Sequence, residues 1–153
     1  MTGARLALWI VTLAAVIGII LSAVSLQAHY RTDKSEFCDL NETFNCDLVN
    51  RSEYSHIGPV PVAGIGLAGY VFLLALSRIS PQRKRDWIIF LSALTGQVFA
   101  LYLTYVEAYV LATWCILCLA SLAMISIITA TSGVLAFRRS PRKSFNAEGA
   151  EAP

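Results

Sequence analysis

The first long apolar stretch of the chain, residues 6–28, reads LALWIVTLAAVIGIILSAVSLQA and contains no charged residue. A helix needs about 20 apolar residues to cross the hydrocarbon core of a bilayer, so this stretch can span one. Residues 60–76 and 114–137 are also uncharged, and residues 87–110 carry a single charge, Glu107. The sequence therefore predicts four membrane-spanning segments.

The composition also indicates a membrane protein. Only 14% of the residues are charged and the mean hydropathy is +0.61, whereas a soluble domain carries about 25% charged residues. These values exclude a disordered chain and an ordinary water-soluble globule, and a formal net charge of +2 is too small to indicate a nucleic-acid partner. Because lipid offers free backbone amides no partner, we expect an all-α bundle of four transmembrane helices rather than a barrel. Residues 1–137 form this single domain, and residues 138–153 are expected to be a disordered cytoplasmic tail.

Lysine and arginine residues predict the orientation of the bundle, because they are enriched in cytoplasmic loops. Eight of the twelve basic residues lie in residues 78–86 and 138–143, four in each segment. The loop of residues 29–59 instead holds three basic and six acidic residues. We therefore expect both termini to be cytoplasmic and this long loop to face outward. The first span could alternatively be a cleaved signal peptide, but its apolar run exceeds the about 7–15 residues of a signal-peptide core.

All four cysteines fall on the predicted outer side, where disulfides form and persist. Cys38 and Cys46 lie in the long loop, whereas Cys115 and Cys118 belong to the motif WCILC at residues 114–118. A helix that begins near this motif favours the thiolate of Cys115 through its N-terminal partial charge, and Cys118 lies one turn deeper on the same face. Such a pair can close a reducible disulfide at the membrane boundary. A quinone is the obvious lipid-dissolved acceptor of two electrons there.

The loop pair is expected to behave differently from the pair in the fourth span. A disulfide between Cys38 and Cys46 would close a short, mobile and exposed ring that an outside thiolate could attack. Because thiol–disulfide exchange proceeds by thiolate attack, the ring could then exchange with the second pair. Two unlike pairs on one side of the membrane thus suggest a two-step redox relay.

Other interpretations of the four cysteines remain open at this point. They could be buried thiols that only pack, or disulfides that pin the outer loop of a non-catalytic membrane scaffold. They could also form a four-cysteine zinc site. Zinc sites usually offer two short Cys-x-x-Cys segments, and the seven residues between Cys38 and Cys46 do not match that spacing, so we expect no metal.

Together these motifs resemble the vitamin K epoxide reductase family, and the chain looks like a bacterial member without a fused thioredoxin-like domain. The resemblance covers about residues 5–137. It rests on Phe37-Cys38-Asp39, Cys46, Ser52, Gly58-Pro59-Val60-Pro61, Gly66-Leu67-Ala68-Gly69-Tyr70 and Trp114-Cys115-Ile116-Leu117-Cys118.

The resemblance implies a four-helix bundle around a quinone pocket, covered by a short amphipathic segment within Leu48 to Ile57. Cys115 and Cys118 match the active-site pair of the family, with Cys118 contacting the quinone, and Cys38 and Cys46 match its shuttle pair. Ser52 matches a residue that assists near the quinone, although it could equally cap a helix. The implied quinone is ubiquinone or menaquinone. The implied thiol partner is a thioredoxin-fold protein of the DsbA type, and the implied location is a bacterial inner membrane, with the cysteines on the periplasmic side.

Two departures from the family bear on the direction of the reaction. The animal enzymes that reduce vitamin K epoxide carry an asparagine and a tyrosine where this chain has Val62 and Leu122, neither of which donates a side-chain hydrogen bond. We therefore expect electrons to run from a protein dithiol to a quinone, supporting disulfide formation. The alternative is a quinone or epoxide reductase driven by a luminal thiol. Glu107 and His56 are candidate proton relays, although an interfacial role explains each as well.

Overall fold

The structure, a computed structural model, describes residues 2–30, 39–41, 43–79 and 83–138. Cys38 and the expected tail beyond Arg138 lie outside the described residues. Within them the chain is largely helical, in the order α1, β1, β2, α2, a 3₁₀ turn, β3, β4, α3, α4, a π turn and α5.

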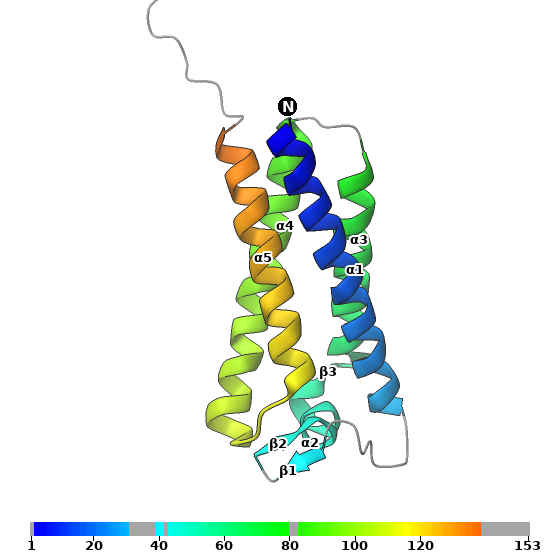
Figure 1. The fold of residues 1–153 in the computed structure, drawn as a ribbon. Helices are drawn as coiled ribbons and strands as arrows, with labels where there is room; N and C mark the ends of the chain where they lie inside the picture. Colours follow the sequence, from blue (N-terminus) through cyan, green and yellow to red (C-terminus); the bar gives the residue numbers. More distant parts are fainter. Residues whose placement is uncertain (1, 31–38, 42, 80–82, 139–153) are drawn as a thin grey trace, which may run out of the picture.

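The predicted all-α fold with four apolar helices is confirmed, with three long helices and one shorter one. The helices are α1 (Thr2–Tyr30), α3 (Val62–Arg78), α4 (Arg83–Val106) and α5 (Ile116–Arg138). α1 packs along both α3 and α5, α4 packs along α5, and α3 contacts α4 less extensively than these pairs contact each other (Figure 1). Three helical segments, Gly3–Tyr30, Lys84–Leu111 and Ile116–Arg138, are long and apolar enough to cross a membrane, and α3 is a shorter apolar helix.

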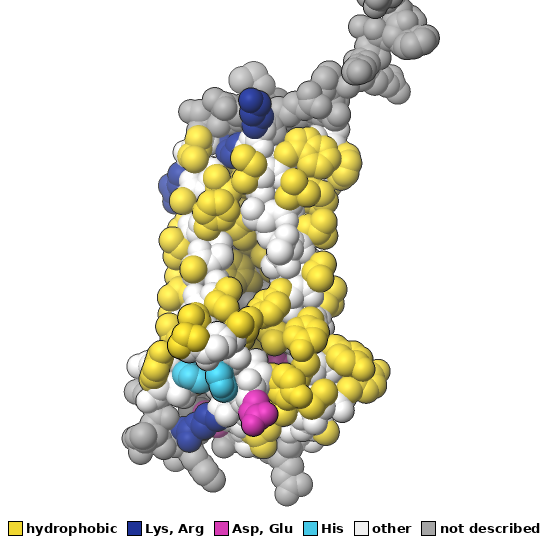
Figure 2. All heavy atoms as spheres, turned by 180° about the vertical axis from the view of Figure 1, so that it is seen from behind, with side chains coloured by type: hydrophobic (Ala, Val, Ile, Leu, Met, Phe, Trp, Pro, Cys, Tyr) yellow, Lys and Arg dark blue, Asp and Glu magenta, His cyan; other side chains and the backbone are white. Residues whose placement is uncertain are grey.

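The outer surface of the bundle is apolar. Large side chains stand exposed along the helices, including Leu13 on α1, Phe72 on α3 and Val98 on α4, which a lipid environment explains. Figure 2 shows hydrophobic side chains along the length of the molecule, with most of the basic side chains in view at one end, and the histidines with a basic and an acidic side chain at the other. The bundle therefore has an apolar belt between two polar ends.

Short elements cover the end of the bundle that lies opposite the N-terminus (Figure 1). They are β1 (Asp39–Asn41), β2 (Phe44–Asn45), α2 (Cys46–Arg51), a 3₁₀ turn (Glu53–Ser55), β3 (His56–Ile57) and β4 (Val60–Pro61). β1 pairs antiparallel with β2, and β3 with β4 around Gly58, whose φ of +61° suits glycine. The expected covering segment is present, but its helix begins at Cys46, two residues earlier than expected.

The β1–β2 hairpin is fastened to the segment before α5. Asn45 N–H donates to the Trp114 carbonyl at 3.2 Å, and Trp114 N–H donates to the Thr43 carbonyl at 2.9 Å. These backbone bonds hold Trp114 in a bridge beside Phe44, so α5 starts at Ile116 instead of at the predicted residue 114. The hairpin and the start of α5 thus form one unit.

Tyr70 is a central packing residue of the bundle. It is buried, and its hydroxyl donates to the Ser121 carbonyl of α5 at 2.8 Å. A Cβ at Gly18 of α1 would overlap the Tyr70 ring, whereas a Cβ at Gly69 would meet nothing within 4 Å. Close helix contact at this level therefore depends on Gly18, and Gly69 borders open space.

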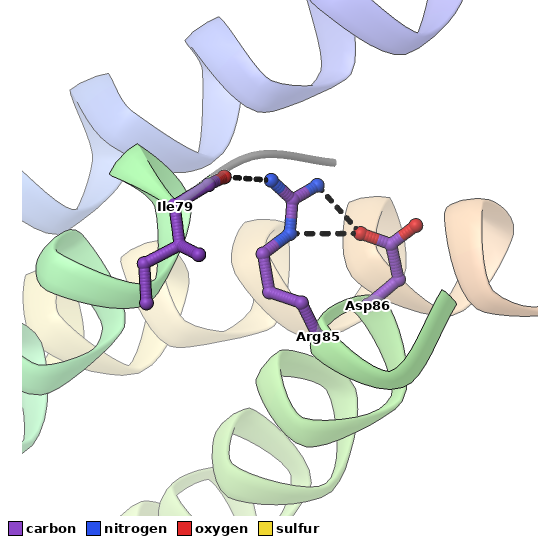
Figure 3. Close-up of polar contacts among 3 residues, drawn as sticks. All are labelled: Ile79, Arg85 and Asp86. Carbon is purple, nitrogen blue, oxygen red and sulfur yellow. Dashed lines mark hydrogen bonds and ion pairs between the residues drawn. The ribbon is translucent and has the colours of Figure 1, made fainter. Parts of the chain in front are cut away.

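A buried ion pair lies at the end of the bundle that holds the N-terminus. The Arg85 guanidinium donates to Asp86 Oδ1 through Nε at 3.1 Å and Nη2 at 2.6 Å, and through Nη1 to the Ile79 carbonyl (Figure 3). Arg85 and Asp86 are 4% and 1% exposed. The pair therefore ties the end of α3 to the start of α4, and Arg85 brings no free positive charge to this end of the bundle.

Candidate functional site

Cys115 and Cys118 stand at the start of α5. The Cys115 carbonyl accepts the first helical bond, from Leu119 N–H at 3.0 Å, which places Cys115 at the N-cap and not in the first turn. Both cysteines are free thiols; Cys115 is fully buried and Cys118 is partly buried. The motif thus presents two reduced thiols on neighbouring turns.

The N-cap position affects the acidity of Cys115. A hydrogen bond from the Cys118 thiol lowers the pKa of the Cys115 thiol, and the backbone N–H groups of Cys118 and Leu117 add to this, while burial opposes it. A lowered pKa increases the thiolate fraction, and the thiolate is the reactive form in disulfide exchange. Cys115 is therefore suited to exchange with another disulfide.

Glu107 lies against this pair of thiols. A five-residue π turn, Glu107–Leu111, ends α4, and Ala112 follows it in the left-handed region at φ 49°. Glu107 is 2% exposed, and its Oε2 accepts from Cys115 N–H at 3.1 Å. A π turn of this kind inside a long helix is often found at functional sites.

One carboxylate oxygen of Glu107 and the sulfurs of Cys115 and Cys118 all lie within 4.8 Å of one another. This is a donor set that a soft cation could use, with one ligand fewer than a closed zinc site requires. Cys46 is disulfide-bonded, so it has no thiolate to complete a four-cysteine site in this structure. The described residues therefore do not supply the four thiolates of a four-cysteine zinc site.

Cys46 lies in the same buried region as Cys115. Cys46, Val49 and Cys115 form one buried cluster, against which Leu117 and Cys118 pack. Cys46 has no exposed surface, so the expectation of an exposed disulfide at this residue is wrong. The reason is the docked hairpin, which brings α2 down onto the start of α5 and covers Cys46.

A cavity of about 270 Å³ extends from the thiols into the bundle. All four apolar helices and α2 line it, largely with apolar side chains, and its size is near the lower end of the about 300–1,000 Å³ of small-molecule sites. The polar groups at its wall include Ser25, His29, Asn50, Ser52, Glu107 and Cys118. The site therefore combines a thiol with an apolar chamber that has a few polar contacts.

Ser52 and His56 were both expected near this chamber. Ser52 lines it, and its hydroxyl donates to the Val49 carbonyl at 2.8 Å, so it also closes the end of α2. His56 is exposed and is not among the lining residues. Val62 lines the cavity, whereas Leu122 packs against the main core.

Sequence reasoning missed a polar cluster formed by Ser25, His29 and Asn50. Ser25 Oγ donates to Asn50 Oδ1 at 2.8 Å, and His29 Nδ1 bonds the Asn50 carbonyl at 2.6 Å. Ser25 and His29 are four residues apart on α1, so they share one helix face. That spacing at the C-terminal end of the first apolar helix is the signal that could have revealed them.

The comparisons with known proteins agree with this arrangement. No curated protein matches the chain. The model of the vitamin K epoxide reductase family matches residues 9–132, which is most of the chain and includes Cys38, Cys46, Cys115 and Cys118. The chain therefore belongs to the vitamin K epoxide reductase family and is a multi-pass membrane oxidoreductase.

Proposed function

We propose that the protein oxidises the dithiol of a DsbA-like thioredoxin-fold protein and reduces a quinone, ubiquinone or menaquinone. Electrons pass from the partner to Cys38 and Cys46, then to Cys115 and Cys118, and then to the quinone. The balance is one protein dithiol plus one quinone giving one disulfide plus one quinol, with two electrons and two protons transferred. The observation that carries the proposal is the buried contact of Cys46 with Cys115 beside Cys118 and the cavity.

The first step is exchange with the partner at the loop disulfide, which we pair as Cys38–Cys46 because these two cysteines match the shuttle pair of the family and Cys46 is disulfide-bonded. Cys46 is fully buried, so an incoming thiolate attacks the sulfur of Cys38 and Cys46 leaves as a thiolate. The second partner thiol then attacks the mixed disulfide and releases Cys38. The partner leaves oxidised and the loop pair is reduced.

The second step is exchange inside the protein. The Cys46 thiolate attacks Cys115 in an oxidised Cys115–Cys118 pair and releases Cys118 toward the cavity. Cys38 then attacks Cys46, which restores the loop disulfide and leaves Cys115 and Cys118 reduced. A disulfide-bonded Cys46 with free thiols at Cys115 and Cys118 is the arrangement found in the structure, and it supports this order of events.

The third step is reduction of the quinone in the cavity by the Cys115–Cys118 dithiol, which becomes a disulfide again. Cys118 lines the cavity, so its sulfur is the one that faces the quinone. Glu107 also lines it, and its Oε1 has no hydrogen-bond partner within the described part of the chain. We assign Glu107 the transfer of a proton from the thiols to the quinone, and Ser52 the support of the ring from the α2 side. His56 has no contact with the cavity that would give it a part in this step.

The membrane placement follows from the two ends of the bundle. Most of the basic side chains in view lie at the end that holds the N-terminus (Figure 2), and α2 and the start of α5, which carry Cys46, Cys115 and Cys118, lie at the other (Figure 1). The proposal therefore sets both termini in the cytoplasm and the cysteines on the periplasmic side of a bacterial inner membrane. In that oxidising compartment they meet the partner protein whose dithiol they oxidise.

The experiment is a coupled assay with the purified full-length protein in detergent. Reduced DsbA-like protein is mixed with ubiquinone-1 or with menadione, and quinone absorbance and partner thiols are followed together. The proposal expects one quinone reduced per dithiol oxidised, and loss of turnover in Cys118→Ser. Unchanged partner oxidation in Cys118→Ser would show that the electrons take another path.

A further inference from the structure

Two buried side-chain atoms in the described part of the chain have no hydrogen-bond partner: Asn50 Nδ2 and Glu107 Oε1. Both residues line the same cavity. Asn50 is 7% exposed, so water does not satisfy its amide from the bulk. Unsatisfied buried donors are rare in folded proteins, and each one calls for an explanation.

Contacts from α1 fix the orientation of the Asn50 amide. Ser25 Oγ donates a hydrogen bond to Asn50 Oδ1 at 2.8 Å. This bond occupies the oxygen of the Asn50 amide, whereas its NH₂ group has no partner among the described residues. His29 Nδ1 bonds the backbone carbonyl of Asn50 at 2.6 Å and so fixes α2 at the same point. A carbonyl is only an acceptor, so His29 Nδ1 carries the proton of this bond. The free NH₂ is therefore held in place, and it is a donor only.

A ligand that satisfies this group must offer an acceptor within an apolar chamber. A quinone has that chemistry, because its two carbonyl oxygens accept hydrogen bonds while its ring and tail are apolar. Val62, on the same cavity wall, has no polar side-chain atom to offer instead. The free hydrogen-bond donor at the cavity is therefore Asn50, which belongs to the covering helix α2.

We infer that Asn50 Nδ2 donates a hydrogen bond to one carbonyl oxygen of the bound quinone, and that Ser25 and His29 are positioning residues that aim it. The inference rests on the proposed quinone chemistry and adds the residue that selects and orients the ring. The hydrogen bond strengthens as the carbonyl gains electron density during reduction, because bonds to charged acceptors are the stronger ones. The same contact therefore favours both binding and reduction.

The test compares Asn50→Leu, which removes the donor at similar volume, with Gln97→Leu as a matched control. Gln97 Nε2 donates to Ser126 Oγ at 2.9 Å, and Gln97 is not among the residues that line the cavity, so its replacement also removes an amide–serine bond. With ubiquinone-1 as the probe, Asn50→Leu should raise both the dissociation constant and KM about fivefold to thirtyfold. Gln97→Leu should leave both constants unchanged. Ser25→Ala should raise them less than Asn50→Leu, because the donor remains but its orientation is lost.

An infrared measurement separates a direct contact from a structural effect. Ubiquinone-1 labelled with ¹³C at its carbonyl carbons should show a downshifted carbonyl band when bound to the wild-type protein, and Asn50→Leu should return that band toward its position in an apolar solvent. An unchanged band and unchanged affinity in Asn50→Leu, with normal wild-type turnover, overturn this inference alone. A wild-type protein that binds with the Asn50-dependent band but does not turn over supports the contact and contradicts the redox proposal. A wild-type protein that binds no quinone contradicts both.

Discussion

Cys46 and Cys115 pack in one buried cluster, although Cys46 begins a short loop helix and Cys115 caps a long helix far along the chain. Neither side chain has exposed surface. In the proposed relay, exchange between these two sulfurs is therefore shielded from outside thiols. The proposal accordingly has the incoming protein react at Cys38, the other cysteine of the loop pair.

The acidity of Cys115 gives a prediction that can be measured directly. Its pKa is lowered chiefly by the hydrogen bond from the Cys118 thiol, so its thiolate should form at a lower pH than that of an ordinary cysteine. The measurement is thiolate absorbance at 240 nm against pH in Cys38→Ala/Cys46→Ala protein, with a matching Cys115→Ala sample subtracted. Adding Cys118→Ala should move the midpoint upward, because the strongest stabilising contact is removed. A midpoint at or above the ordinary value in the parent protein would show that burial outweighs the hydrogen bond.

Gly69 borders the cavity, and filling its space should block the quinone. In Gly69→Leu the new side chain starts from a point where nothing lies within 4 Å, so it extends into the chamber without a backbone clash. We expect loss of quinone reduction with thermal unfolding unchanged or raised, since leucine favours the helix over glycine by about 1 kcal/mol. Partner-driven reduction of the cysteines without quinone should remain at the wild-type rate. Normal quinone turnover in Gly69→Leu would place the quinone elsewhere.

Gly18→Ala is predicted to lower the stability of the bundle. The added methyl overlaps the buried Tyr70 ring, which is fixed by its bonds to Ser121, so the helices must separate. Overpacking of this kind costs about 1–3 kcal/mol. Denaturant or thermal unfolding in detergent should show this loss of stability. Unchanged stability would mean that α1 and α3 are less tightly packed than the structure shows.

The number and type of the apolar helices could be predicted from sequence, because every backbone polar group in lipid must be hydrogen-bonded within the protein. An uncharged run such as residues 6–28 has one stable form in a bilayer, a helix that satisfies its own backbone. The helix ends could not be predicted equally well. Trp114 belongs to an apolar run in the sequence, which predicts that the helix begins there. In the structure its backbone is hydrogen-bonded to Thr43 and Asn45, and because of this long-range contact α5 begins only at Ile116.

The sequence also shows that a Cys-x-x-Cys motif occurs together with two spaced loop cysteines. It does not show that part of this loop is buried. Its polar composition predicts exposure, and Cys46 and Asn50 are buried instead because the hairpin docks on the bundle. The role of Asn50 depends on Ser25 and His29, which arrive from another helix. A linear pattern does not contain such a contact.

The Arg85–Asp86 pair predicts a stability effect far from the thiols. Asp86→Asn leaves the 4%-exposed Arg85 without its counter-charge, and breaking one side of a buried pair costs about 3–5 kcal/mol. Lys84→Gln, at an exposed neighbouring position, is the matched control and should change stability little. Unfolding in detergent checks both variants. Equal stability of Asp86→Asn and Lys84→Gln would contradict the assignment of the pair as a structural tie.

The most direct test of the electron path is to trap its central intermediate. In Cys38→Ser protein treated with ubiquinone-1, the quinone oxidises Cys115 and Cys118 to a disulfide that Cys46 can attack. The residue proposed to release Cys46 is gone, so exchange should stop with Cys46 bonded to Cys115. Peptide mapping by mass spectrometry without reduction should find the Cys46–Cys115 disulfide as the main linked species, with Cys118 alkylatable. The account predicts this species in Cys38→Ser and its absence in Cys38→Ser/Cys115→Ser. A Cys46–Cys118 disulfide as the main product, or no link between α2 and α5, would contradict the path through Cys115.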